Sequence, residues 1–465
     1  SMTAVGTIVV RAVQVTATFI TVLAVGAYYA GHPSPPNQLL DPATLGKLSK
    51  LVMGVIAPLL VVVSIGETVT VQMLTREGWV LVVWSFIFLG TCYVISSVVA
   101  VVAAVRPAFR DEFVMAATFP NALALPLVMM TTLCRQEPFV GKNFAEEESD
   151  TEVTCTEQSL SFLFIYTTGW ILTFFATAYP HVLDSDGEAG VSWHHGVRRR
   201  LAGVANTNVL SLLVGFGIAM WAPLKNELYT SEGGLLWLSS AAFTLGGPLV
   251  GLSSIILGGT LGQSLLRMRA ERRRSGGTSP AAGVVPNRTL SLATVSSGGR
   301  ERTEFVPGPD GRAGLHAESG AGSRAISLPA KADQQHGAAE VAGADLVWNE
   351  VEGADAQVER PSWRTQALLV ATRMVLCPAV CVVLLMYTLE AMMPPSTHEI
   401  NAKLVKLILV LEAVVPSADF VVVLCIRGGR VAAAEALAIT YLWEYLTGIV
   451  TITVGIAVAM AWIGE

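Results

Sequence analysis

Three polar side chains flank one proline in an otherwise apolar run near the end of the chain. Glu412, Ser417 and Asp419 surround Pro416 in the segment LEAVVPSADFV. A charged side chain inside a bilayer is costly, at about 2.5–3.5 kcal/mol for Asp on insertion scales. Protonation, a bound cation or a wet cavity could offset this cost. Glu412 and Asp419 are therefore candidates for coupling solute movement to a proton or cation, or for tuning local charge. The alternative is that both make structural hydrogen bonds between helices.

A second proline, Pro120, precedes an asparagine in the apolar segment TFPNALALPLV. The amide of Asn121 can donate to a carboxylate and accept from a hydroxyl or a ring N–H. A proline removes a backbone donor and disturbs the carbonyl one turn earlier, so each proline predicts an interrupted helix. In lipid such breaks are tolerated where they line a cavity. The alternatives are a plain proline kink and an Asn121 side chain that only caps the exposed backbone.

Two broken helices predict a binding site near the middle of the membrane. The N-terminus of a half-helix carries partial positive charge and favours an anion. The predicted substrate-binding residues are Pro120, Asn121, Pro416 and Ser417. Glu444, in the segment YLWEYL, is a third acid inside an apolar run. It could act with Glu412 and Asp419 or simply bond to a neighbouring helix.

The elements that position these residues are membrane spans. The chain has 465 residues, of which 52% are hydrophobic and 14% charged, whereas soluble proteins carry about 25% charged residues. Apolar runs of about 20 residues recur and do not alternate, which indicates helices rather than a barrel. We therefore expect an all-α membrane protein. Its ten spans are predicted at 6–30, 46–66, 79–105, 113–134, 159–183, 206–223, 236–262, 364–389, 403–426 and 431–462.

Similar segments recur in the two parts of the chain. APLLVVVSIG in the second span resembles GPLVGLSSIILGG in the seventh, and the two prolines discussed above lie in the fourth and ninth spans. Five spans per copy would invert the second copy in the membrane, as in many secondary transporters. The predicted units are a first five-helix repeat at 5–183, a cytoplasmic connector at 184–205, and a second repeat at 206–262 and 364–462. The remaining segment, 263–363, is rich in Ser, Gly, Ala, Pro and charge and is predicted to be a disordered cytoplasmic loop.

Positive charge predicts the orientation of the spans. Lys and Arg gather in alternate loops, for example at Arg198, Arg199 and Arg200, and this side should be cytoplasmic. With ten spans, both termini then lie outside the cell or in an organelle lumen. In such a compartment Cys134 and Cys155 could form a disulfide, or they could remain two free thiols. Arg373 lies nearer a span end, and we expect its side chain to reach the interface.

No motif suggests an enzyme. HExxH, a phosphate-binding GxxxxGK[ST] and a GxSxG with plausible partners are all missing from the sequence, and the cysteines and histidines form no metal-ligand pattern. We expect no cofactor and no metal. The sequence also shows no basic face for nucleic acid.

Several segments resemble the auxin efflux carriers, and among them the PIN-LIKES branch with its fungal and algal relatives. FPNALALPLVMMTTLC (119–134) is similar to that family's GN-x-GN-LPL…C segment, with Asn121 at the first asparagine and Ala124 at the second. NTNVLSLLVG (206–215), LEAVVPSADFVV (411–422) and the W-x-Y at 443–445 fit as well. Cys155 matches a cysteine that recurs in the PIN-LIKES branch. Glu412 departs from the family by standing where a glutamine is usual.

The resemblance implies ten helices, with two crossing broken helices divided between a scaffold and a mobile transport bundle. It also implies transport of indole-3-acetate or similar weak acids, at the endoplasmic reticulum membrane or alternatively the plasma membrane. The long loop departs from the branch by lying between the seventh and eighth spans.

The leading hypothesis is a carrier for small organic anions that are auxin-like and partly apolar, working by alternating access. One alternative is a sodium- or proton-coupled symporter for organic acids of the bile-acid type. Another is a membrane sensor that binds the solute without moving it. The expected partners are the solute and membrane lipid, and a homodimer is a further possibility.

Overall fold

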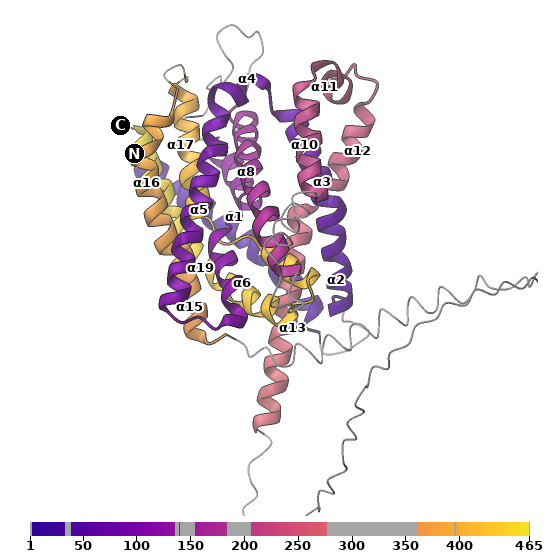
Figure 1. Cartoon of the computed structure of the whole chain (residues 1–465), viewed down its shortest axis with the longest axis vertical. Coiled ribbons are helices and arrows are strands. Elements are labelled where there is room, and N and C mark those ends of the chain that lie inside the picture. Colours follow the sequence, from indigo (N-terminus) through magenta and orange to yellow (C-terminus); the bar gives the residue numbers. More distant parts are fainter. Residues whose placement is uncertain are drawn as a thin grey trace, which may run out of the picture. The chain divides into compact units, whose positions relative to one another are not determined.

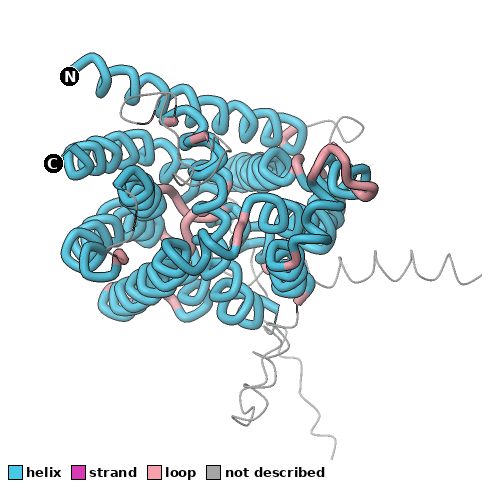
Figure 2. Tube along the Cα trace, turned by 90° about the horizontal axis from the view of Figure 1, so that it is seen from above, coloured by secondary structure: helices cyan, strands magenta, loops and turns pink. Residues whose placement is uncertain are grey.

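The computed structural model describes residues 2–32, 39–134, 139, 154–183, 206–276, 361–394, 397 and 399–464. Within these ranges the chain is helical and contains no strand, which confirms the predicted all-α class (Figures 1 and 2). The chain forms two compact units, of which the first comprises Ser1–Ala270 and Glu350–Glu465. The helices discussed below belong to this first unit, apart from the end of α13 after Ala270. The predicted connector at 184–205 lies outside the described residues.

The helices of the first half of the chain begin with one long helix and end with another. They are α1 (Met2–Ala30), α2 (Pro42–Leu51), η2 (Val52–Ile56), α3 (Ala57–Thr68), α4 (Val71–Met73), η3 (Leu74–Gly78), α5 (Trp79–Val102), α6 (Pro107–Thr118), α7 (Ala124–Leu133) and α8 (Cys155–Leu183). Here η marks a π-helical turn.

The second half contains the remaining helices. They are α10 (Thr207–Met220), α11 (Ala222–Tyr229), α12 (Leu236–Gly246), α13 (Leu249–Gly276), α15 (Trp363–Ala371), η4 (Thr372–Leu376), α16 (Cys377–Met392), α17 (Glu399–Val414), α18 (Asp419–Arg427) and α19 (Val431–Gly464). The predicted loop at 263–363 therefore starts too early, because α13 continues to Gly276. The part of this segment from 277 to 360 lies outside the described residues.

Six helical stretches of the described chain are long and apolar enough to cross a membrane, and the number rises to seven if the bent pair α10 and α11 is one span. The protein is thus an integral membrane protein. The predicted spans at 113–134 and 403–426 are not among the six, because each is divided into two short helices. Ten spans in two inverted repeats stay a prediction.

One set of helices, which we call the first helix group, consists of α1–α3 and α10–α13. α3 packs against α10 and α12 (Figure 1). Glycines bring these backbones close together: a Cβ on Gly258 of α13 would strike the carbonyl of Leu23 on α1, and one on Gly246 of α12 would lie 2.8 Å from the backbone nitrogen of Leu60 on α3. Small residues of this kind are typical of tight helix packing in lipid.

The second helix group consists of α4–α8 and α15–α19. α5 packs against α6 and α8, and α19 packs against α17 and α18. Gly169 on α8 faces Ser85 on α5, and a Cβ on Gly448 of α19 would lie 3.1 Å from the ring of Pro416. Among the described residues, the glycines at which a Cβ would strike another helix all pack inside one group or the other. The two groups meet instead through contacts such as α3 with α8 and α1 with α19.

Two π-helical turns precede prolines inside spans. η2 comes just before Pro58, and η4 comes just before Pro378. A proline ring clashes with the carbonyl four residues earlier, here in Gly54 and Met374. A π-turn at that place widens the helix locally, and such turns are frequent at functional sites. Arg373 lies within η4, so this π-turn helps to set the position of its side chain.

Candidate functional site: the crossing of two broken helices

The two predicted helix breaks lie against each other. The segment between α6 and α7 and the segment between α17 and α18 run antiparallel, with a bridge between Pro120 and Ser417. The N–H of Asn121 donates to the carbonyl of Pro416 at 2.8 Å, and the N–H of Ala418 donates to the carbonyl of Phe119 at 2.9 Å. Both prolines therefore interrupt their helices, and the interruptions meet. We call this region the crossing.

Side chains of the second helix group bind the backbone groups that the breaks release. The indole Nε1 of Trp170 donates to the carbonyl of Pro120 at 3.1 Å. The N–H of Ser417 donates to Glu444 Oε2 at 3.0 Å, and its hydroxyl donates to the carbonyl of Ala116 at 2.6 Å. Unwound backbone can persist at membrane depth because the protein supplies these partners.

Asn121 is buried and already uses its amide. The oxygen Oδ1 accepts from the N–H of Ala124 at 3.1 Å and so caps the first turn of α7. Nδ2 donates to the hydroxyl of Tyr445 at 2.9 Å. The capping alternative is thus realised, and the same residue lines the cavity described next. Sequence reasoning noted the W-x-Y motif but missed Tyr445 as the partner of Asn121, because only the fold brings α19 to the crossing.

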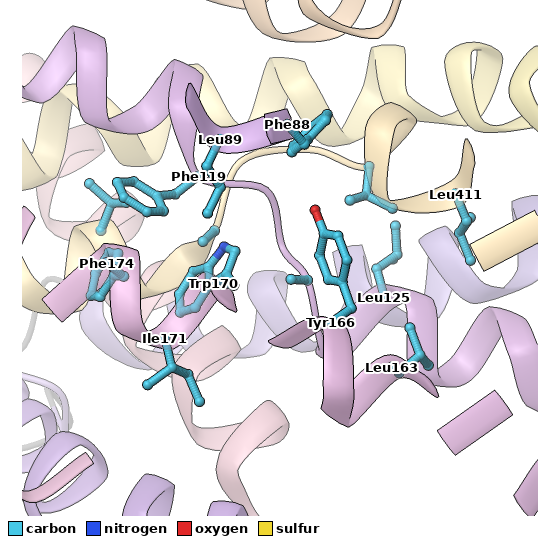
Figure 3. Packing of buried hydrophobic residues seen from close by; sticks show 14 of the residues in the cluster. Phe88, Leu89, Phe119, Leu125, Leu163, Tyr166, Trp170, Ile171, Phe174 and Leu411 are labelled. Carbon is cyan, nitrogen blue, oxygen red and sulfur yellow. The ribbon is translucent and has the colours of Figure 1, made fainter. Parts of the chain in front are cut away.

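A narrow cavity of about 50 Å³ lies at the crossing, between the two helix groups. Its wall is mostly apolar and aromatic, and its lining includes Phe164, Trp170, Phe175 and Phe420 together with Val61, Ile65 and Leu249. Trp170 stacks on Phe174 at 4.8 Å between ring centroids, and both lie near Phe119 (Figure 3). The polar lining residues include Asn121, Asn208, Ser253 and Asp419. A mostly apolar wall with a few polar groups is typical of small-molecule sites.

Only one of the three predicted acids lines the cavity. Asp419 starts α18, is 1% exposed and lines the cavity, where its carboxyl interacts with the hydroxyl of Ser253 and its Oδ2 has no hydrogen-bond partner among the described residues. Glu412 and Glu444 are equally buried but do not line the cavity. Asp419 alone is therefore placed to meet a solute, and Glu444 binds the backbone of the break.

Arg373 was predicted to reach the membrane interface, and this prediction is wrong. The side chain is fully buried, and its Nη2 donates to the carbonyl of Val415 at 2.7 Å, immediately before Pro416. The π-turn η4 and the following Pro378 place it there. Hydropathy along one helix could not reveal this position, because the partner lies on a different helix.

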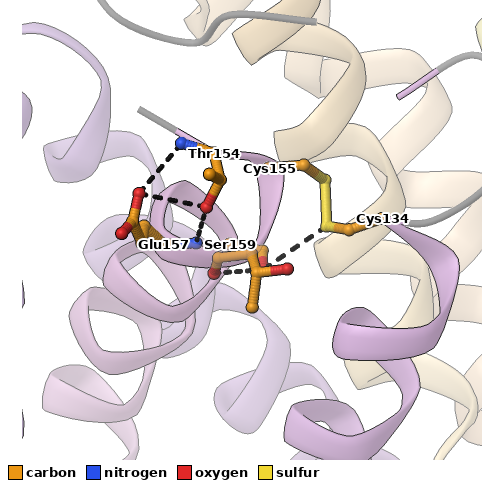
Figure 4. Close-up of a disulfide and its surroundings, with 6 residues drawn as sticks. Cys134, Thr154, Cys155, Glu157 and Ser159 are labelled. Atoms are coloured by element: carbon orange, nitrogen blue, oxygen red, sulfur yellow. Dashed lines mark hydrogen bonds between the residues drawn. A yellow bond between two sulfur atoms is a disulfide. The ribbon is translucent and has the colours of Figure 1, made fainter. Parts of the chain in front are cut away.

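A disulfide joins Cys134, at the end of α7, to Cys155, at the start of α8 (Figure 4). α8 starts at this point because Thr154 and Glu157 form a capping box: the N–H of Thr154 donates to Glu157 Oε2 at 2.9 Å, and the N–H of Glu157 donates to the Thr154 hydroxyl at 3.3 Å. The disulfide thus ties α7, a half-helix of the crossing, to α8, which carries Trp170. The described residues contain no cluster of His, Cys, Asp and Glu that could hold a metal ion.

Comparison with known proteins identifies the family. The family described as "membrane transport protein" has a sequence model that matches residues 12–276, which is more than half of the chain and includes the break at Pro120. A search of curated proteins found none that matches. The family-level resemblance to the auxin efflux carriers is confirmed, and the PIN-LIKES branch stays a prediction. This chain, with its crossed broken helices and its membrane spans, belongs to the membrane transport protein family.

Proposed function

We propose that the protein carries small, partly apolar organic anions of the auxin type, such as indole-3-acetate, across a membrane. The observation that carries the proposal is the position of the cavity. It lies where two half-helices, α7 and α18, begin beside an aromatic wall. Helix starts favour negative charge, and the wall suits a planar ring.

The two helix starts are not equivalent for an anion. α18 begins with Asp419, whose carboxylate would repel a solute carboxylate. α7 begins beside the neutral amide of Asn121. We therefore place the solute carboxylate at α7, with its ring near Trp170 and Phe420. The unpartnered Oδ2 of Asp419 is then available to accept a hydrogen bond from the solute, for example from an indole N–H.

The small volume of the cavity supports movement during transport. Pockets that hold drug-sized ligands measure about 300–1,000 Å³, which is far more than the volume here. The glycines at close helix contacts lie inside one helix group or the other among the described residues, whereas the crossing cavity lies between the groups. We propose that the first helix group is the scaffold and the second is the mobile bundle. Their relative movement would open the crossing to alternate sides.

Uptake of labelled indole-3-acetate into liposomes that contain the purified protein tests this function. Unlabelled benzoate, taurocholate and 1-naphthaleneacetate serve as competitors. We expect uptake above protein-free liposomes and stronger competition by 1-naphthaleneacetate than by taurocholate, because 1-naphthaleneacetate shares the planar aromatic ring and short carboxylate arm of indole-3-acetate. The variant Asn121→Ala should reduce uptake, whereas Asn226→Ala, an exposed asparagine on α11, should not. Equal uptake with and without protein would reject the proposal.

We also propose the endoplasmic reticulum membrane as the location, with both termini in the lumen. The disulfide between Cys134 and Cys155 is compatible with that side, since the lumen is oxidising and the cytosol is not. Protease protection of a tag at either terminus, in intact and in permeabilised microsomes, tests the orientation. Cleavage in intact microsomes would contradict it.

A further inference from the structure

A buried arginine lies behind the crossing and has no part in the proposed solute site. Arg373 is fully buried in the second helix group and does not line the cavity. Its guanidinium lies 5.8 Å from the ring centroid of Phe88, and its Nη2 binds the carbonyl of Val415. A permanently charged side chain at such a depth requires compensation from its surroundings.

Two buried acids are the candidates for that compensation. Glu412 and Glu444 flank the same break, and both interact electrostatically with Arg373. Among the described residues neither acid forms an ion pair with Arg373 within contact distance, and Glu412 has no hydrogen-bond partner for either oxygen. The hydroxyl of Tyr166 is also buried and has no hydrogen-bond partner among the described residues. It points in the direction of Phe88 (Figure 3). One fixed cation therefore shares this interior with two acids.

The carbonyls at the end of α17 already have partners from the protein. In many transporters the carbonyls of an unwound helix bind the coupling cation. Here the carbonyl of Val414 accepts from the hydroxyl of Thr451 at 3.4 Å, and that of Val415 accepts from Arg373 at 2.7 Å. The carbonyl of Pro416 accepts from the N–H of Asn121 at 2.8 Å. Three successive carbonyls thus face protein donors, and one of these donors carries a full positive charge.

We propose that the guanidinium of Arg373 acts as a built-in cation at the crossing, in the place where a sodium ion would otherwise bind the α17 carbonyls and the nearby acids. Neither the stability of the crossing nor the movement of solute then depends on sodium. The part of this inference that concerns solute movement rests on the proposed function, and the part that concerns the crossing does not. Arg373 is in this sense a positioning residue, because it touches the backbone of the break and not the solute.

The first test uses the unmodified protein in detergent. The midpoint of thermal unfolding is measured in sodium chloride and in N-methyl-D-glucamine chloride at equal ionic strength. We expect the same midpoint in both, because the binding of a ligand to the folded state alone would raise it. A midpoint that rises with sodium in a saturable manner would overturn the proposal. This measurement needs no solute, so its result is independent of the liposome assay.

The second test replaces the built-in cation. Arg373→Ala should lower the midpoint, and millimolar guanidinium should restore part of the loss, whereas tetramethylammonium should not. Arg373→Lys keeps the charge, so its unfolding midpoint should lie between those of the wild type and Arg373→Ala. The matched control is Arg364→Ala, an exposed arginine on α15 that should respond to neither salt. If Arg373→Ala does not fold, Arg373→Lys is compared with the neutral Arg373→Gln. Equal midpoints for Lys and Gln, or the lack of guanidinium rescue in a folded Arg373→Ala, would reject a cationic role.

The third test separates the two proposals. Initial uptake of indole-3-acetate is measured with sodium and with N-methyl-D-glucamine outside the liposomes, and we expect the rates to agree within about two-fold, since no sodium binding contributes to the cycle. Uptake that requires sodium would overturn the inference but would support transport. No uptake in either salt would reject the proposed function, and the unfolding midpoints would still decide the role of Arg373.

Discussion

The backbone N–H of Asn121 donates to the carbonyl of Pro416, so main-chain atoms join two residues that are far apart in the sequence. The bond is possible only because both helices are unwound at this depth. Each break supplies the partner that the other needs, and Trp170 and Glu444 bind two of the remaining groups. A change at the crossing should therefore affect both stability and solute binding.

The hydroxyl of Tyr445 should contribute to stability through Asn121. Tyr445→Phe removes the acceptor of the 2.9 Å bond from Asn121 Nδ2 and should lower the free energy of unfolding by about 1–3 kcal/mol, because a buried donor loses its partner. Tyr441→Phe is the matched control: Tyr441 is equally buried, but its hydroxyl has no partner among the described residues. Thermal unfolding in detergent compares the two. Equal losses would show that the Asn121 bond is not the cause.

The indole N–H of Trp170, and not only its aromatic ring, should contribute to stability and to solute binding. Trp170→Phe keeps an aromatic side chain at the cavity but leaves the carbonyl of Pro120 without its donor, which should cost about 1–3 kcal/mol. Indole-3-acetate should also bind more weakly. Trp237→Phe, at an exposed position on α12, serves as the control. Isothermal titration and thermal unfolding measure both effects, and a Trp170→Phe variant that resembles the control would contradict the assigned contact.

The carboxyl of Asp419 should distinguish solutes that have a ring N–H. Asp419→Ala removes the acceptor, so the preference for indole-3-acetate over 1-naphthaleneacetate should disappear. Asp419→Asn removes the charge but keeps an oxygen, so it should preserve the preference and tighten the binding of both anions. Competition for labelled indole-3-acetate gives the ratio of the two affinities. If the ratio is unchanged in Asp419→Ala, the solute does not contact this residue.

An ion pair connects the two helix groups away from the crossing. Arg267 on α13 lies 3.3 Å from Glu435 on α19, and the carboxylate is 2% exposed. We expect Arg267→Glu to destabilise the observed arrangement because two acids then face each other, and to change the initial rate of indole-3-acetate uptake into liposomes. The double variant Arg267→Glu with Glu435→Arg should recover most of the effect. A double variant as impaired as the single one would argue against pairing.

The disulfide should protect Cys134 and Cys155 from thiol reagents. A maleimide reagent applied to the protein unfolded in sodium dodecyl sulfate should label neither residue before reduction and both after it, whereas the four free cysteines should be labelled in both states. Cys134→Ser should lower stability by about 2–4 kcal/mol, as is usual when a native disulfide is lost. The control, Cys425→Ser, leaves the disulfide intact. Labelling of Cys155 in the unreduced wild type would contradict the bond.

Local features of the sequence were sufficient to predict the membrane character, the helical class and the two helix breaks. The length and apolar content of a span depend only on neighbouring residues, and so does the effect of Pro120 or Pro416 on its own helix. The capping box at Thr154 is equally local. The hydrophilic stretch at 263–276 was misjudged because its composition does not reveal that α13 continues to Gly276.

Tertiary structure alone decided which polar groups meet. Asn121 and Tyr445, or Arg373 and Val415, are far apart in the sequence, and no periodicity predicts their contact. Glu412, Asp419 and Glu444 looked alike as acids in apolar helices, yet only Asp419 lines the cavity. The physical reason is that the cost of burying a charge can be read from one helix, whereas the group that compensates it can come from any helix that packs nearby.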